Sequence, residues 1–317
     1  MKVLVTGADG FVGRHLIPRL LETGHRVMAA CRPGGEPPET WLDGRWRGAV
    51  EVIPLEITDS DSVRAAVDGS CDAIVHLAAI ASVREASRDP GRAWTVNAAG
   101  TARLLDAAAA RQGAAGRLPL VLVISTAEVY GSGPAVARRE SDPLAPQSAY
   151  AASKAGAELA ALEAWRRTGL PVVIARPFPH TGPGQDAQYV VPSFVQRLLA
   201  ARASGSATVA TGNLDPVRDL LDVRDVAEAY LSLLVKGVPG EAYNVARGEG
   251  VSLRELFRRL ADLIDVRAEP SPDPSLMRGV DIPYLVGDVG KLRRATGWFP
   301  RFSLDQTLQE LVNAQAH

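Results

Sequence analysis

The sequence predicts an α/β protein, with a doubly wound parallel sheet and a smaller lobe in the C-terminal half. Apolar, β-type runs alternate with helical patterns through the first half of the chain, as is typical of that architecture. Some runs, such as residues 118–124, are almost continuously apolar, which indicates strands buried on both faces of a parallel sheet. With 317 residues, 46% of them hydrophobic, the chain is long enough for two lobes.

The first strand leads into a glycine-rich turn. Gly7, Gly10 and Gly13 follow the apolar run 3–5, and a helical pattern comes next, with one apolar face formed by Leu16, Ile17, Leu20 and Leu21. Glycines let the backbone close on a pyrophosphate, and the helix N-terminus offers that anion free N–H groups. The pattern therefore predicts a Rossmann-type dinucleotide site.

The other elements of this half follow in order. Strands are expected near 2–6, 26–30, 50–54, 73–77, 119–125 and 171–175. A helix is expected over 90–111, because a cap residue at 89 precedes proline at the first helical position. A second helix is expected over 149–168, ending at Gly169.

After about residue 176 the pattern changes to shorter, more separated helices. Pro/Gly-rich loops lie at 177–184 and 266–283. Two capping boxes predict helix starts, namely Ser252 with Glu255 and Ser303 with Gln306. We therefore divide the chain into a dinucleotide-binding domain, 1–175, and a substrate-binding lobe, 176–317, which is partly interleaved with the first.

Composition narrows the class of protein. The net charge of −1 argues against a nucleic-acid partner. Cys31 and Cys71 form neither a disulfide framework nor a zinc site, and no metal role is expected for His76, which lacks partner ligands at suitable spacing. The first strand begins at the N-terminus without a leader pattern, and no apolar run approaches a membrane span. A cytoplasmic protein is expected.

Tyr150 and Lys154 form a candidate acid/base pair. They are four residues apart in a strongly helical stretch, so both side chains share one helix face. A phenol exchanges protons poorly at neutral pH, and a neighbouring ammonium is expected to lower its pKa. Only four of the 35 basic residues are lysines, which makes this lysine more informative.

A hydroxyl and a carboxylate follow the fifth strand. Thr126 comes at its carboxyl end and Glu128 two residues later. Ligands bind at this edge of a parallel sheet, so the Thr126 hydroxyl is expected to hold a substrate oxygen beside Tyr150.

These motifs together resemble the extended short-chain dehydrogenase/reductase family of nucleotide-sugar epimerases, dehydratases and reductases. The matching segments are 6–13, 76–79, 97–101, 126–131 and Tyr150-x-x-x-Lys154. The resemblance implies that Thr126, Tyr150 and Lys154 form the catalytic triad, and that Lys154 also holds the nicotinamide ribose. Its implied cofactor-binding residues are Gly7, Gly10, Phe11, Val12, Gly13, Glu56, Ile57, Leu77, Ala78, Ala79 and Lys154. Glu56 stands where an aspartate usually reads the adenine amine.

The second half resembles the GDP-4-keto-6-deoxy-mannose reductases. The matching segments are 176–185, 212–219, 222–225, 243–245 and 296–300. The resemblance implies that Arg218 and Arg278 face the nucleotide diphosphate, for which the guanidinium fork is suited. Pro179 departs from the family, because most relatives carry there an asparagine that donates to the substrate, so the identity of the sugar stays open.

The end of the second strand bears on cofactor choice. No acidic residue that could bind the 2′-hydroxyl of NAD stands at 31 or 32, and Arg32 offers positive charge to a 2′-phosphate instead. We therefore expect NADP(H) as the cofactor. The alternatives are NAD(H) as the cofactor and an Arg32 side chain that faces solvent without binding a cofactor.

Several functions remain open at this stage. The first is reduction of a sugar C4 ketone, with Tyr150 delivering the proton. The alternatives are a 4,6-dehydratase, in which Glu128 would be a further acid/base rather than a loop anchor, a 4-epimerase, and a non-catalytic nucleotide sensor on the same fold. The alanine-rich helices 90–111 and 149–168 are expected to pair in a homodimer, as the family resemblance favours.

Overall fold

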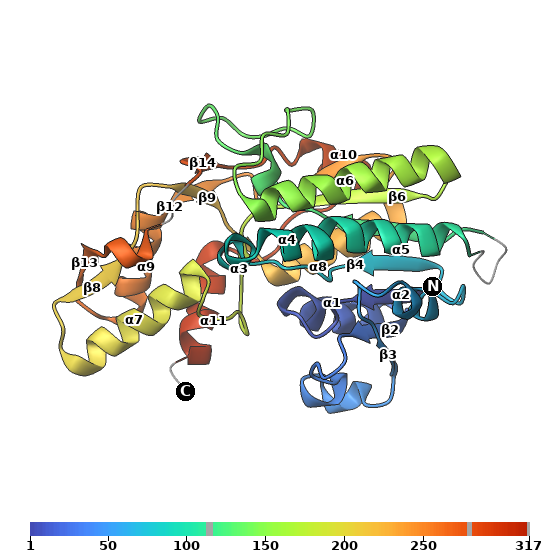
Figure 1. Cartoon of the computed structure of the whole chain (residues 1–317). Helices are drawn as coiled ribbons and strands as arrows, with labels where there is room; N and C mark the ends of the chain where they lie inside the picture. Colours follow the sequence, from blue (N-terminus) through green and yellow to red (C-terminus); the bar gives the residue numbers. More distant parts are fainter. Residues whose placement is uncertain (112–116, 278–280, 316–317) are drawn as a thin grey trace.

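The computed structural model describes residues 1–111, 117–277 and 281–315 (Figure 1). Its centre is a seven-stranded parallel sheet in the order β11-β6-β5-β4-β1-β2-β3. The strand bounds are β1 Lys2–Thr6, β2 Arg26–Cys31, β3 Val50–Pro54, β4 Ala73–His76, β5 Leu120–Ile124, β6 Val172–Pro177 and β11 Ala242–Val245. The predicted doubly wound parallel sheet is confirmed, and all six predicted strands belong to it.

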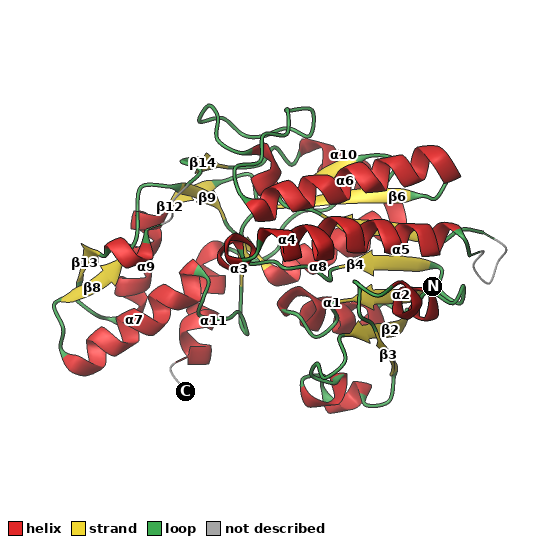
Figure 2. Cartoon of the chain, in the orientation of Figure 1, coloured by secondary structure: helices red, strands yellow, loops and turns green. Residues whose placement is uncertain are grey.

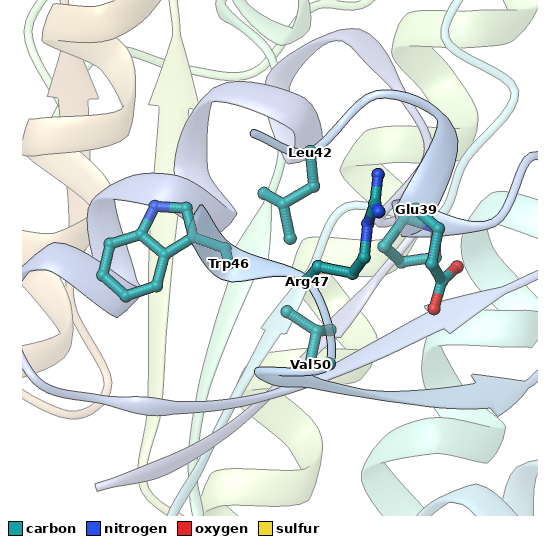
Figure 3. A pocket seen from close by; sticks show the side chains of 7 residues that line it. Glu39, Leu42, Trp46, Arg47 and Val50 are labelled. Atoms are coloured by element: carbon teal, nitrogen blue, oxygen red, sulfur yellow. The ribbon is translucent and has the colours of Figure 1, made fainter. Parts of the chain in front are cut away.

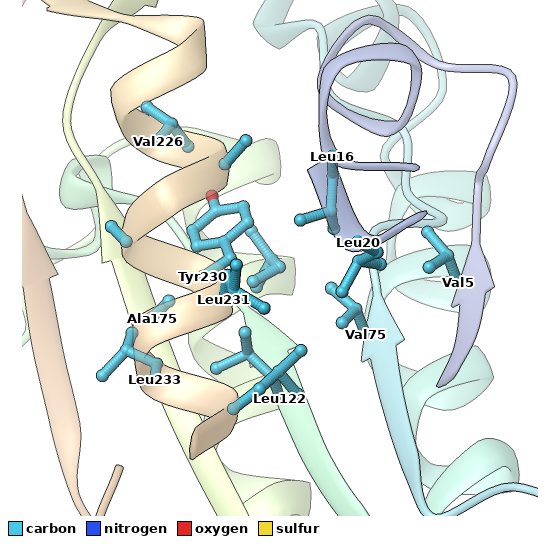
Figure 4. Close-up of a cluster of buried hydrophobic side chains, with 14 of the residues drawn as sticks. Val5, Leu16, Leu20, Val75, Leu122, Ala175, Val226, Tyr230, Leu231 and Leu233 are labelled. Atoms are coloured by element: carbon cyan, nitrogen blue, oxygen red, sulfur yellow. The ribbon is translucent and has the colours of Figure 1, made fainter. Parts of the chain in front are cut away.

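Helices cover both faces of the sheet (Figure 2). One face carries α1 (Phe11–Glu22) and α8 (Val223–Lys236), and the other carries α2 (Ser60–Ala66), α5 (Gly100–Ala109) and α6 (Ala149–Thr168). Successive residues of a strand point to opposite faces, so Val3 packs in the first layer and Leu4 in the second. Figure 4 shows part of the first layer, where Tyr230 of α8 lies in one core with Leu16 of α1.

The predicted helix over 90–111 is interrupted. It divides into α4 (Pro90–Ala93), a π-helical stretch η3 (Trp94–Ala99) and α5. The wide turn holds Asn97, whose side chain accepts from Ile80 N at 2.8 Å and donates to Ser153 Oγ at 2.9 Å. These buried hydrogen bonds join three segments of the chain and explain the π-helical interruption, which helical periodicity in the sequence cannot reveal. The other predicted helix, α6, is confirmed and ends at Gly169, where φ is 75°.

The C-terminal half adds a separate core at one end of the sheet (Figure 1). Its helices are α7 (Val190–Ser204), α9 (Leu253–Ile264) and α11 (Leu304–Gln315), whereas α10 (Gly290–Thr296) packs with α8 in the first layer of the main sheet. The short strands of the C-terminal half are β7 (His180–Thr181), β8 (Thr208–Thr211), β9 (Val217–Asp219), β10 (Leu221–Asp222), β12 (Gly250–Ser252), β13 (Glu269–Pro272) and β14 (Tyr284–Leu285). Both predicted helix starts are confirmed: Glu255 N donates to Ser252 Oγ at 3.1 Å, and Gln306 N to Ser303 Oγ at 3.2 Å. The reciprocal bond of a capping box is seen at the second start, where Ser303 N donates to Gln306 Oε1 at 2.8 Å, whereas the Glu255 carboxylate binds Arg258 and Arg259. Because β11 joins the main sheet, this half is interleaved with the first, and the residue-176 boundary stays a prediction.

The remaining elements are short. They are α3 (Val83–Arg88) and the 3₁₀ turns η1 (Pro38–Thr40), η2 (Gly44–Trp46), η4 (Ala127–Tyr130) and η5 (Pro274–Leu276). Within the described parts of the chain, no helix combines the length and apolar character needed to cross a membrane.

Candidate active site

The predicted site residues gather at the carboxyl ends of the parallel strands. β1 and β4 are neighbours there, although β2 and β3 lie between them in the sequence, so the winding direction reverses at this point and leaves a crevice for a ligand. Gly7 follows β1 with φ of 65°, and a Cβ added to it would lie 2.8 Å from Ala78 N after β4. The glycine loop therefore lies directly against residues 77–79.

The glycine loop fits a pyrophosphate. A Cβ on Gly13 would lie 2.4 Å from Ala8 O, so the turn closes too tightly for any side chain there. Helix α1 begins at Phe11, and Gly10 before it provides no side-chain cap. Its first N–H groups and the positive end of its dipole are therefore available to an anion.

His76 has a structural position at the end of β4. Its ring pairs Nδ1 with Thr6 Oγ1 at 2.8 Å and Nε2 with Thr101 Oγ1 at 3.0 Å. Burial, aided by the charge of Lys154, lowers the pKa of His76 to about 3, so the ring is neutral. Thr6 Oγ1 also accepts from Ala78 N at 3.1 Å, which fastens residues 77–79 to the glycine strand.

Arg32, Glu56 and Ile57, which are predicted to bind the adenosine part of the cofactor, follow β2 and β3. Arg32 is exposed. The Glu56 carboxylate accepts from the Thr58 hydroxyl at 2.7 Å and from Thr58 N at 3.0 Å. These hydrogen bonds, with a smaller contribution from Arg32, lower the pKa of Glu56. Ile57 is buried against Gly100.

Sequence reasoning missed one acidic group at this end. A Cβ on Gly35 would lie 2.7 Å from Asp9 Oδ2, which places the carboxylate beside the loop after β2. Burial and then the charge of Asp9 raise the pKa of Cys31 to about 11. The signal was present, because Asp9 lies inside the glycine motif whose turn brings it to the end of the second strand.

Thr126 and Tyr150 meet as expected, but the pKa of the phenol moves in the opposite direction to the prediction. The Thr126 hydroxyl lies close enough to the phenol to act on its pKa, and Thr126 also caps η4 by accepting from Glu128 N at 3.3 Å. Burial and then the negative charge of Glu128 raise the pKa of Tyr150, while the Thr126 hydrogen bond acts against this rise. The phenol is therefore protonated at neutral pH.

Lys154 is buried one turn further along α6. Burial lowers its pKa to about 8, and the carboxylate of Glu158 partly restores it. The charge of Lys154 acts on His76 and is not among the causes that move the pKa of Tyr150. The predicted lowering of the phenol pKa by Lys154 is wrong for this arrangement, because desolvation and Glu128 dominate.

A pocket lies near the Tyr150–Lys154 pair, between the loops after β5 and residues of the C-terminal half. It is lined by Val83, Glu128, Gln147, Ser148, Arg218, Asp281, Ile282 and Leu285. Arg218 Nη2 donates to Asp281 Oδ1 at 2.6 Å and Arg218 Nη1 to Ile282 O at 2.6 Å. The pocket thus brings Glu128 and Arg218 together, with Asp281 as a partner that the sequence did not predict.

Two predicted substrate residues do not line this pocket as far as the structure describes it. Pro179 is on the β6–β7 connection, and its carbonyl accepts from Leu221 N at 3.0 Å. Arg278 lies outside the described residues. A further pocket in the β2–β3 connection (Figure 3) includes Glu39, Trp46 and Arg47, and none of the predicted site residues that the structure describes lines it.

Comparison with known proteins assigns the family. The model of the GDP-mannose 4,6 dehydratase family matches residues 4–311. GDP-6-deoxy-D-mannose reductase of Pseudomonas aeruginosa is 35% identical, over 98% of this chain and 96% of that protein. The solved structure of RMD from Pseudomonas aeruginosa complexed with NADPH superposes with a TM-score of 0.81 at 34% identity, covering 99% of this chain and 98% of that one.

A dehydratase is similar in structure as well. The dTDP-glucose 4,6-dehydratase of Streptomyces venezuelae, crystallised with NAD and TYD, gives a TM-score of 0.88 at 29% identity, covering 100% of this chain and 97% of that one. The similarity therefore extends over both lobes and includes proteins solved with NADPH and with NAD. The chain therefore belongs to the GDP-mannose 4,6 dehydratase family, within the extended short-chain dehydrogenases/reductases.

Proposed function

We propose that the chain is an NADP(H)-dependent reductase that converts the C4 ketone of a GDP-linked 4-keto-6-deoxy sugar to an alcohol. The observation that carries the proposal is the close Thr126–Tyr150 pair, placed by β5 and α6 at the same sheet edge as the glycine loop. The reductase relative, 35% identical over 98% of the chain, supports the choice of reaction and of nucleotide.

The described residues suit a nicotinamide dinucleotide. The backbone of Gly7 to Gly13 and the N-terminus of α1 would hold its pyrophosphate, and the ammonium of Lys154 would bind its nicotinamide ribose. When bound, the reduced cofactor supplies a hydride to the carbonyl carbon. Thr126 holds the carbonyl oxygen beside Tyr150, and the phenol O–H donates its proton to that oxygen as the C–O double bond becomes a single bond.

The pocket beside the pair would hold the rest of the substrate. Arg218 lines it and carries a guanidinium that can pair with two phosphate oxygens. Its present partner, Asp281, is joined to it at 2.6 Å, so this carboxylate both orients the guanidinium and competes with an incoming diphosphate.

One observation favours 4,6-dehydration as a second candidate. Glu128 lines the substrate pocket and its charge reaches Tyr150, so it is placed to act as a further acid/base near the sugar. Removal of water across C5 and C6 needs such a group in addition to the tyrosine.

Turnover assays distinguish the two candidates. Purified protein mixed with GDP-4-keto-6-deoxymannose and NADPH should oxidise NADPH stoichiometrically, measured by absorbance. A dehydratase would instead convert GDP-mannose to the 4-keto-6-deoxy product with no net change in NADPH. Conversion of GDP-mannose without NADPH consumption would overturn the reductase proposal.

The proposed assembly is a homodimer formed through the α4–η3–α5 segment and α6. Trp94 at the start of η3 is 45% exposed and Leu159 on α6 is 67% exposed, so this face presents apolar side chains to solvent. Light scattering after size exclusion should give twice the chain mass, and Leu159→Glu should return it to the mass of one chain.

A further inference from the structure

A buried ion pair lies one helical turn from Lys154. Glu158 follows Lys154 by one helical turn on α6, and its side chain is 2% exposed. Arg176 of β6, 8% exposed, donates to it from Nη2 at 2.7 Å and from Nε at 3.0 Å. Ser125 at the end of β5 donates its hydroxyl to the same carboxylate. Two neighbouring strands thus hold one carboxylate on the catalytic helix.

The end of β5 thus contacts α6 at two places. Ser125 binds α6 at Glu158, and the next residue, Thr126, lies beside Tyr150 of α6. The two attachment points are eight residues, or about 12 Å, apart along the helix. A shift of the end of β5 relative to α6 would break the Ser125–Glu158 hydrogen bond, so Glu158 helps to keep Thr126 beside Tyr150.

Stability alone is a weak reason for such a pair. Burying two opposite charges sacrifices their hydration, and replacement by neutral side chains of similar volume is often neutral or stabilising. We propose that Glu158 is a positioning residue of the active site, which holds the Lys154 ammonium charged and in place and fixes the end of β5 against α6. The inference rests on the proposed function, because it assigns Lys154 a part in that reaction.

The charges around Lys154 set the direction of the expected effects. Glu158 faces it from its own helix and His76 from β4; His76 is neutral, and burial together with the Lys154 charge keeps its pKa near 3. Arg176 of β6 lies behind Glu158 and offsets part of its charge, while Glu128 of η4 lies on the Tyr150 side. Removing the charge of Glu158 should therefore lower the pKa of Lys154, and removing that of Arg176 should raise it.

Lysine titration measures this directly. The chain has four lysines, at 2, 154, 236 and 291, so 13Cε-lysine labelling gives four NMR signals, and Lys154→Arg identifies the one required. In wild type that signal should titrate near pH 8. In Glu158→Gln its pKa should fall by about one unit, the lower end of what one close charge does, and in Arg176→Met it should rise.

The double variant and a surface variant complete the set. Glu158→Gln combined with Arg176→Met removes both members of the buried ion pair, and its Lys154 pKa should lie between those of wild type and Glu158→Gln. Glu163→Gln removes a carboxylate that is 57% exposed on the same helix and should change nothing. If a single variant does not fold, the double variant still tests the inference, because its Lys154 pKa should be lower than that of wild type.

The same variants are then assayed for turnover. The alkaline limb of the kcat profile with NADPH and keto-sugar should move with the Lys154 pKa, so that kcat of Glu158→Gln is about fivefold below that of wild type at pH 8. An unchanged Lys154 pKa in both the Glu158→Gln and the double variant overturns the inference. If the pKa moves as expected but no keto-sugar is reduced by wild type, the proposed function fails while the electrostatic role of Glu158 stands.

Discussion

Replacing Gly7 with alanine tests the geometry of the cofactor loop. Two terms add in the folded state. Alanine at φ of 65° carries the left-handed penalty of about 1–2 kcal/mol. Its Cβ would also lie 2.8 Å from Ala78 N and 3.0 Å from Ala78 Cα, a contact with backbone that no rotamer change can relieve, and overpacking of this kind costs about 1–3 kcal/mol. The free energy of unfolding should fall by about 2–5 kcal/mol.

Cofactor binding should weaken together with stability. The strain is relieved when the loop moves away from residues 77–79, and binding must restore the original position. The steric part, about 1–3 kcal/mol, corresponds to a roughly 5- to 150-fold higher Kd for NADPH. Urea unfolding and fluorescence titration with NADPH measure the two effects.

Gly24 provides the matched control. Its φ is 79°, but a Cβ there would meet nothing within 4 Å. Gly24→Ala should therefore lose only about 1–2 kcal/mol and leave the Kd of NADPH unchanged. If Gly7→Ala and Gly24→Ala prove equal in both stability and affinity, the close approach of Gly7 to Ala78 has no energetic consequence and the reasoning is refuted.

Three further changes test other parts of the site. Tyr150→Phe should lower kcat by about 10²–10⁴, the usual contribution of a general acid, with NADPH binding nearly intact by fluorescence titration; unchanged turnover would exclude the phenol as the acid. Arg32→Ala should weaken NADPH but not NADH, and Asp9→Asn should favour NADPH because it removes a carboxylate near the expected 2′-phosphate; tighter NADH binding in wild type, unaffected by Arg32→Ala, would contradict the cofactor proposal. Arg218→Met should raise the KM for the nucleotide sugar about tenfold, as loss of a charge-assisted pair does, and an unchanged KM in steady-state kinetics would remove Arg218 from the substrate site.

Periodicity predicted the fold well because the sheet is buried on both faces. Strands such as β5 are unbroken apolar runs, and few other elements produce that pattern. The helix over 90–111 shows the limit. Its residues have ordinary helical periodicity, whereas the wide turn at η3 depends on Asn97 meeting Ile80 and Ser153, which are distant in the sequence. Contacts of this kind are invisible until the chain is folded.

The site was predicted to the extent that its motifs are local. The glycine loop and the Tyr150–Lys154 spacing each lie within one element, so residue type and spacing were enough to select them. Asp281 could not be found in this way, because only the pairing of β9 with β14 brings Arg218 beside it. Glu158 was within reach, since it stands four residues after Lys154 on the same helix face, but its partners Ser125 and Arg176 come from other strands.

The charges around the phenol bear on the direction of the chemistry. An epimerase or a dehydratase begins by oxidising an alcohol, for which the tyrosine must act as a base, and burial together with Glu128 opposes the phenolate form. A reductase needs the opposite form, a protonated phenol ready to donate, which the same two influences stabilise. The neutral nicotinamide of a reduced cofactor would add no positive charge to reverse this, whereas the cationic ring of an oxidised one would favour the phenolate. The protonated phenol that this arrangement favours is the form from which a reductase starts, and an epimerase or a dehydratase needs the same form when it returns hydride to the sugar.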